Sequence, residues 1–195
     1  MGEKLVALKS DWNIVFRKDY SVANSLTERE YESCTFRNCD FSGADLSNKS
    51  FIDCVFENCN LSMTSVKNVS LKTVKFLSCK LLGLNFSDCN PFLLSMTFEN
   101  SLMNLTSFYK LKLKGTKFKN CELQEADFTD ADLTLSLFDN CNFERAIFEG
   151  SNLEKSDFRT SFHYSIDPTV NRIKKAKFSR DGLAGLLDKY DIIIE

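Results

Sequence analysis

The sequence contains little of what most enzymes use for catalysis. Its 195 residues include one histidine, His163, and only seven glycines and two prolines. It has no Gly-rich phosphate-binding loop, no G-x-S-x-G nucleophile motif and no metal-ligand spacing. We therefore expect a protein that is not an enzyme and that uses neither a metal ion nor a cofactor. His163 is expected at a corner of the fold and not as a catalytic base.

Charge and hydropathy disfavour two further classes of protein. The chain has 25 Lys and Arg residues against 27 Asp and Glu residues, so its net charge is −2. It lacks the basic excess that holds nucleic acid through counterion release. It also lacks a run of about 18 apolar residues that could cross a membrane, and its N-terminus does not resemble a secretory signal. We expect a cytoplasmic protein that binds neither nucleic acid directly nor membranes.

What the sequence has in abundance is a five-residue period. Every fifth position from Tyr31 to Phe86 is apolar, and after a shift of two residues the same period runs from Phe98 to Phe158. This period fits neither the 3.6 residues of a helical turn nor the alternation of a plain strand. Two inward positions, with one outward residue between them and two outward residues after them, describe a short strand and a corner. Four such faces close a square coil of about twenty residues, and stacked coils form an all-β solenoid.

The cysteines fit the same period. Seven of the eight lie two residues before a periodic apolar position, in a slot that otherwise holds mainly Ala, Ser and Thr, and Cys89 takes the same place before Pro91. The sequence has no C-x-x-C pair. We expect reduced, buried thiols that stack in columns, beside ladders of stacked phenylalanines such as Phe36, Phe56 and Phe76.

The repeats also match a known motif. Cys-Asp-Phe at 39–41, Ala-Asp-Leu at 44–46 and 131–133, and Ala-Asp-Phe at 126–128 fit the pattern A(D/N)LxX. Over about residues 31–158 the chain resembles the pentapeptide repeat family. This resemblance implies a right-handed quadrilateral β-helix.

The segments outside the regular repeats should cap the solenoid. We expect an N-terminal cap with partial repeats over 1–30, where Trp12, Ile14 and Phe16 are the apolar candidates, the β-helix over 31–162, and a C-terminal capping and dimerisation segment over 163–195. The two-residue slip near 91–95, which contains Pro91, is either a simple insertion or a loop that contacts a partner.

The C-terminal segment predicts an α-helix and an interface. Ser179 can cap an α-helix over about 180–190, whose apolar residues fall on one stripe, and three isoleucines follow it. Such an apolar surface needs cover, so we expect a homodimer joined through the C-terminal ends. The expected interface residues are Leu183, Leu186, Leu187, Tyr190, Ile192, Ile193 and Ile194.

Acidic residues gather in the last repeats. From Cys121 to Asp157 there are ten acidic residues against Arg145 and Lys155. Some can pair with residues twenty positions away, as in Glu125 with Arg145, Lys112 with Asp132, and the column Glu99, Lys119, Asp139 and Arg159. The surplus is either a partner-binding acidic face or part of such surface ladders. The candidate residues are Glu122, Asp127, Asp132, Asp139, Glu144, Glu149 and Asp157.

The tail carries a second resemblance. Tyr164-Ser165-Ile166-Asp167-Pro168, Asn171-Arg172-Ile173 and Gly185-Leu186-Leu187 are similar to the ends of the albicidin and microcin immunity proteins, in the topoisomerase-protecting branch of the family. This resemblance implies a dimer whose acidic surface mimics DNA, binds DNA gyrase or topoisomerase IV, and confers antibiotic resistance or immunity to a toxin. The alternative is a non-catalytic scaffold or adaptor that binds another protein.

Overall fold

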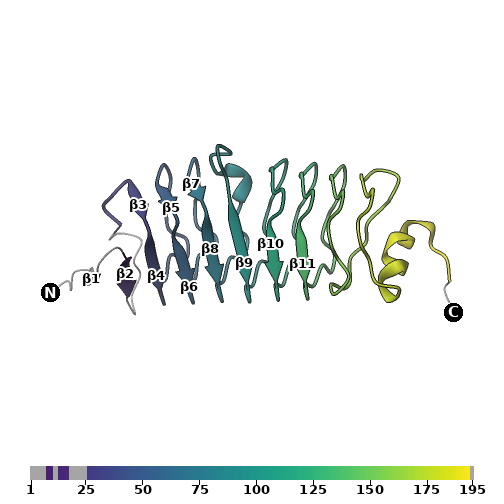
Figure 1. Ribbon diagram of the computed structural model, residues 1–195, viewed down its shortest axis with the longest axis horizontal. Helices are drawn as coiled ribbons and strands as arrows, with labels where there is room; N and C mark the ends of the chain where they lie inside the picture. Colours follow the sequence, from purple (N-terminus) through teal and green to yellow (C-terminus); the bar gives the residue numbers. More distant parts are fainter. Residues whose placement is uncertain (1–7, 11–12, 18–25, 194–195) are drawn as a thin grey trace.

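The computed structural model describes residues 8–10, 13–17 and 26–193. The predicted contributions of Trp12 and Ile194 lie outside the described residues. The chain winds into coils that stack along a rod, with β2 near one end and the C-terminal helices at the other (Figure 1). The strands are β1 (Leu8–Ser10), β2 (Asn13–Arg17), β3 (Glu30–Glu32), β4 (Cys34–Arg37), β5 (Ser50–Ile52), β6 (Val55–Glu57), β7 (Ser70–Lys72), β8 (Val74–Leu77), β9 (Met96–Glu99), β10 (Lys117–Lys119) and β11 (Leu137–Asp139).

Neighbouring coils pair in parallel with a register of twenty residues. Phe36 lies opposite Phe56, and Phe56 lies opposite Phe76, whereas Phe76 lies opposite Phe98 because of the two-residue slip. The predicted solenoid and its period are therefore confirmed. β2 already pairs with β4 in the same register, with Phe16 opposite Phe36, so coil pairing extends into the segment predicted as a cap with partial repeats.

The aligned positions define four faces, which we name A to D in chain order. Face A holds β2, β4, β6 and β8 to β11, and face D begins with β3, β5 and β7 and continues through the bridges Lys112–Asp132 and Asp132–Asn152. Face B follows the bridges Lys80–Leu102, Leu102–Glu122 and Glu122–Asn142, and face C follows Asn85–Ser107, Ser107–Asp127 and Asp127–Ile147.

Stacked phenylalanines fill the interior, as predicted. Phe98, Phe118 and Phe138 stack on face A with ring centroids 5.0 Å apart, and a second column on face C places Phe108 and Phe128 5.0 Å apart. Rings of the two columns meet edge to face. Each fully buried ring contributes about 1.5–3 kcal/mol through burial, so these columns are the main stabilising feature of the rod.

The small side chains two residues before each periodic apolar residue form hydrogen bonds that join adjacent coils. The Cys59 thiol donates to the Phe36 carbonyl oxygen at 3.2 Å, and the Ser161 hydroxyl donates to the Phe138 carbonyl oxygen at 2.9 Å. The same Ser161 oxygen accepts from the Cys141 backbone N–H at 3.1 Å. All eight cysteines are buried and none forms a disulfide, as predicted, and burial raises the pKa of Cys89 to about 12. Cysteine, serine and threonine are interchangeable here because each is small and carries a donor.

Most corners turn through a residue with a positive φ. Asparagine suits this left-handed conformation, and Asn100, Asn120 and Asn140 occupy one corner column between faces A and B, joined by side-chain hydrogen bonds of 2.9 Å. His163 is an exposed corner residue with φ of 58°, as predicted, and its Nδ1 lies 3.1 Å from Asn142 Oδ1.

The slip forms a short projecting loop between η2 (Phe86–Asp88) and β9 (Figure 1). Leu94 packs partly against the core, whereas Phe92 and Leu93 are 67% and 64% exposed. Asn90 Oδ1 accepts from the Phe92 backbone N–H at 3.0 Å and so shapes the turn. The two extra residues thus leave the aromatic columns continuous and add an outward apolar tip.

The C-terminal helix differs from the predicted α-helix. It consists of two 3-10 helices, η3 (Asp181–Leu186) and η4 (Asp188–Tyr190). Ser179 Oγ accepts from the Gly182 N–H at 3.1 Å, which is the capping contact that the sequence predicted. Gly182 and Gly185 pack so tightly on Tyr164 that a Cβ at either position would collide with it. These glycines are also weak α-helix formers, which accounts for the shorter 3-10 turns. None of the helices in the described part of the chain has the length and hydrophobicity of a membrane span.

Candidate partner-binding surfaces

The seven candidate acidic residues do not lie on one face. Coil pairing places Asp139 and Asp157 on face A, Glu122 and Glu144 on face B, Asp127 on face C, Glu149 in the turn after face C, and Asp132 on face D. The sequence count recorded how many acids the last coils contain but not how a twenty-residue turn distributes them. The structure therefore shows an acidic belt around these coils.

On face A, Asp157 is compensated by two cationic side chains, whereas Asp139 has no cationic partner within 4.0 Å in the described part of the chain. Asp157 Oδ2 lies 2.8 Å from Arg159 Nη2 and 3.6 Å from Lys177 Nζ, and the hydrogen bond from Arg159 lowers the pKa of Asp157. The predicted charge column holds only at its start, where Lys119 pairs with Glu99 at 2.8 Å. Arg159 turns to Asp157, two residues away, because a bidentate geometry is available there, and Asp139 accepts from the Thr160 hydroxyl instead. The prediction that Arg159 continues the column is therefore wrong.

The other two predicted pairs have different outcomes. Arg145 Nη2 lies 2.7 Å from Glu125 Oε1, at the corner between faces B and C, so this prediction is confirmed. Lys112 and Asp132 are register neighbours on face D, but within the described residues they form no ion pair within 4.0 Å. The Asp132 carboxylate instead accepts from the Thr134 backbone N–H at 3.0 Å.

Uncompensated acids remain on both sides of the corner between faces B and C, which we call the B/C edge. Asn142 and Gln124 donate to Glu122 and Glu144, each at 2.9 Å, and hold these two carboxylates on face B. On face C, Asp127 accepts from a backbone N–H at 2.9 Å. None of these three carboxylates has a cationic partner within 4.0 Å in the described part of the chain. The structure thus brings together three of the seven predicted residues along one edge, whereas Glu149 lies in the turn from face C to face D.

The sequence interpretation missed apolar side chains on the same edge. Met63, Leu82, Leu102 and Leu105 are 70%, 37%, 41% and 61% exposed, in the coils before the acidic belt. Their positions in the five-residue period are outward ones, and two of them replace the corner asparagine or glycine. These two departures from the repeat were the available signal.

The predicted dimer residues form a partly exposed apolar end. Leu183, Tyr190, Ile192 and Ile193 are 48%, 54%, 55% and 88% exposed, whereas Leu186 packs against the core. Leu187 is half-buried. The predicted stripe is therefore divided between the capping of the last coil and an uncovered surface.

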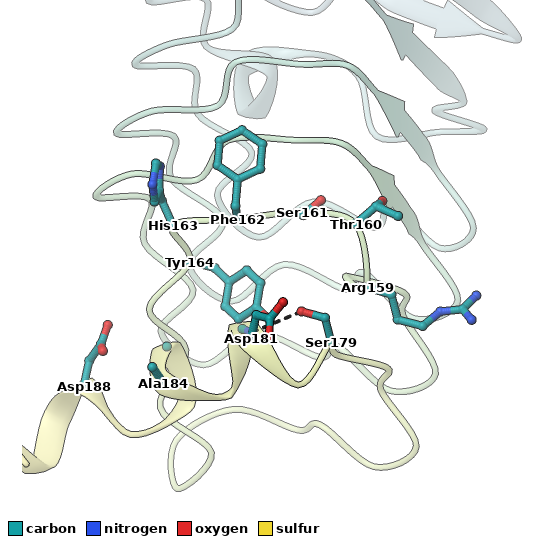
Figure 2. Close-up of a pocket in the computed structure, with 12 residues that line it drawn as sticks. Arg159, Thr160, Ser161, Phe162, His163, Tyr164, Ser179, Asp181, Ala184 and Asp188 are labelled. Carbon is teal, nitrogen blue, oxygen red and sulfur yellow. Dashed lines mark hydrogen bonds between the residues drawn. The ribbon is translucent and has the colours of Figure 1, made fainter. Parts of the chain in front are cut away.

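A cavity lies between this end and the last coil. Its volume is about 500 Å³, and it is lined by residues 159–164 and by parts of the C-terminal helices (Figure 2). The hydroxyls at its margin hold the fold: Ser161 bridges two coils and Ser179 caps η3. In Figure 2 the Arg159 side chain extends away from the other labelled groups, consistent with its bond to Asp157. These contacts give the cavity a structural role in seating the C-terminal segment.

A filled rod of stacked coils with a five-residue period defines a β-solenoid repeat protein. The family profile described as "Pentapeptide repeat region" matches residues 30–104 and 92–162. The chain therefore belongs to the pentapeptide repeat family, and its fold is the right-handed quadrilateral β-helix.

The structure of QnrB1 agrees with this fold, and HetL is a weaker match. Full-length QnrB1, a plasmid-mediated fluoroquinolone resistance protein, matches with a TM-score of 0.56 and 24% identity, over 84% of this chain and 90% of QnrB1. HetL, a pentapeptide repeat protein involved in heterocyst differentiation regulation in the cyanobacterium Nostoc sp., matches with a TM-score of 0.34 and 12% identity, over 82% of this chain and 95% of HetL. A search of curated proteins finds no match.

Proposed function

We propose that this protein binds a type II topoisomerase, DNA gyrase or topoisomerase IV, through its acidic B/C edge and protects the enzyme from a drug or toxin. The observation that carries the proposal is the group of uncompensated carboxylates of Glu122, Asp127 and Glu144 along one edge of a rod. Such a rod offers negative charge to a basic DNA channel, where complementary charge accelerates association. The fold shared with QnrB1 and the tail resemblance to immunity proteins support this choice of partner.

The test is a supercoiling and decatenation assay with purified enzymes and a quinolone or peptide toxin. The wild-type chain should restore activity, and the triple variant Glu122→Gln, Asp127→Asn and Glu144→Gln should restore much less because it loses charge but keeps shape. Glu30→Gln with Glu32→Gln, exposed acids in the first coils, is the matched control and should behave like wild type. No rescue and no binding to either enzyme would reject the proposal.

The proposed protein is a homodimer joined through its C-terminal ends, in the cytoplasm where its target acts. The exposed Tyr190, Ile192 and Ile193 support this, since uncovered apolar side chains at the end of a rod invite a symmetric partner. Leu183→Asp with Ile193→Asp should give monomers by light scattering. Ile147→Asp, at a 50% exposed position on face C, is the control and should remain dimeric. Monomeric wild-type protein at micromolar concentration would contradict the interface.

A second candidate is an adaptor that binds an unrelated protein through the slip loop. Phe92 and Leu93 project from the rod, and Lys72 Nζ lies 5.8 Å from the centroid of the Phe92 ring. Phe92→Ser with Leu93→Asn should abolish capture of such a partner in a pull-down from the native host but leave topoisomerase rescue intact. Loss of rescue in this variant would instead assign the loop to the topoisomerase complex.

A further inference from the structure

In the coils that precede the acidic ones, the B/C edge carries exposed apolar side chains. Met63 and Leu105 lie on the corner itself, whereas Leu82 and Leu102 lie beside it on face B. The backbone ladder brings them together: the Met63 N–H donates to the Leu82 carbonyl oxygen at 2.9 Å, and the Gly83 N–H donates to the Asn104 carbonyl oxygen at 3.0 Å. The Met63 sulfur lies over Gly83, where a Cβ would collide with it. Met63, Leu82 and Leu105 thus lie in three successive coils at one corner, with Leu102 next to them on face B, and we call these four residues the apolar patch.

Local conformation does not favour these residues. Met63 and Leu105 have φ of 56° and 61°, a left-handed conformation that strains any side chain larger than Asn or Gly. The corner between faces A and B meets the same requirement with Asn38, Asn58 and Asn100. At 70% and 61% exposure, Met63 and Leu105 also contribute little burial in return. Their presence is therefore not explained by the stability of the rod.

The surroundings are those of an interface. The outward positions around the patch are mainly uncharged, namely Asn60, Ser62, Ser65, Asn85, Asn104 and Ser107, with Lys67 and Lys80 among them. Leu102 lies directly beside Glu122 in the next coil, and the Leu105 N–H donates to the Gln124 carbonyl oxygen at 2.9 Å. The apolar patch therefore passes without a break into the uncompensated acids. An apolar centre within a polar rim is the usual arrangement of a protein interface, in which Met is enriched.

We propose that Met63, Leu82, Leu102 and Leu105 form an apolar docking patch for the same protein that receives the acids of the B/C edge. This inference rests on the proposed function, and it adds that the partner surface has an apolar recess beside its basic DNA-binding residues. The outer backbone of a DNA duplex presents charged phosphates and not aliphatic side chains, so the patch gives the rod a contact that this backbone lacks. The acids accelerate encounter, and the patch prolongs the complex once it has formed.

The test replaces the corner side chains without weakening the fold. Met63→Asn with Leu105→Asn removes the apolar surface and introduces the residue that the left-handed conformation prefers. Leu93→Asn with Leu135→Asn makes the same exchange at other corners, where φ is 56° and 63° and the exposures are 64% and 50%. Both pairs should melt at or above the wild-type temperature. The backbone of Leu82 and Leu102 is not left-handed, so Leu82→Ser with Leu102→Ser provides a second variant that does not depend on corner strain.

Binding of full-length protein to gyrase and to topoisomerase IV is then measured by surface plasmon resonance at several salt concentrations. We expect the patch variants to dissociate at least tenfold faster, with the wild-type association rate and salt dependence, and we expect the control pair to match wild type. Glutamine variants of Glu122 and Glu144 should instead slow association. A folded patch variant with wild-type dissociation overturns this inference and leaves the proposed function standing. A wild-type chain that binds neither enzyme overturns both.

Discussion

Truncation of one ring in the middle of the rod tests whether the aromatic columns carry its stability. Phe118 in β10 is fully buried, and its ring stacks on Phe98 and Phe138 at 5.0 Å on either side. It also meets Phe108 and Phe128 edge to face at 5.8 and 6.1 Å. The substitution Phe118→Ala therefore removes four ring contacts at once and leaves a void between two coils.

The expected loss lies at the upper end of the range for such changes. Replacing a buried Phe by Ala costs about 3–5 kcal/mol, and the cost is largest where the surroundings cannot collapse into the void. Here parallel pairing of β10 with β9 and β11 fixes the coil spacing on both sides. We expect about 4–5 kcal/mol, which is a large share of the roughly 5–15 kcal/mol that stabilises a typical domain.

Urea unfolding followed by far-UV circular dichroism measures this loss. Each coil contacts only its neighbours, so a damaged central coil should also separate the transition into two steps, one for each half of the rod. Phe92→Ala, at the 67% exposed loop tip, is the matched control and should change stability by less than about 0.5 kcal/mol. A loss below about 2 kcal/mol for Phe118→Ala would refute the view that stacked rings are the main stabilising feature.

Three further outcomes follow from buried or paired groups. Phe128→Asp places a charge in the second column and should prevent folding, so a soluble, cooperatively melting variant would contradict its inward position. The hydrogen bond from Lys189 lowers the pKa of Asp167 from 3.8 to about 2. The contribution of this pair to stability is therefore present above pH 3.8 and is lost as the pH falls through about 2. In Asp167→Asn, the melting temperature should depend less on pH within that window. Burial raises the pKa of Cys89 from 9.0 to about 12. The contribution of this neutral thiol to stability is therefore present below pH 9 and is lost as the pH rises through 12. Cys89→Ala should remove that part of the alkaline destabilisation.

The interior could be predicted from the sequence because backbone pairing allows few alternatives. Once a coil takes twenty residues, Phe98, Phe118 and Phe138 must stack, and the small slots must align between coils. The outward side chains are less constrained. Arg159 can reach either Asp139 or Asp157. It pairs with Asp157, and this choice depends on its side-chain conformation and not on the twenty-residue register. The type of the C-terminal helix also depends on tertiary contact, since Tyr164 packs against its glycines in a way that no local pattern encodes.

The acidity of the last coils is not required by the turns in which it occurs. The Asp127 carboxylate accepts from a backbone N–H two residues ahead, but the neutral amides of Asn142 and Asn152 make the same contact, at 3.2 Å, in other turns. Folding therefore needs an oxygen at this position and not a charge. Glu144 and Glu149 follow the buried residue, where their carboxylates accept from no backbone N–H among the described contacts. Since neighbouring carboxylates repel one another, a surplus that no turn requires is better explained by a partner with the opposite charge.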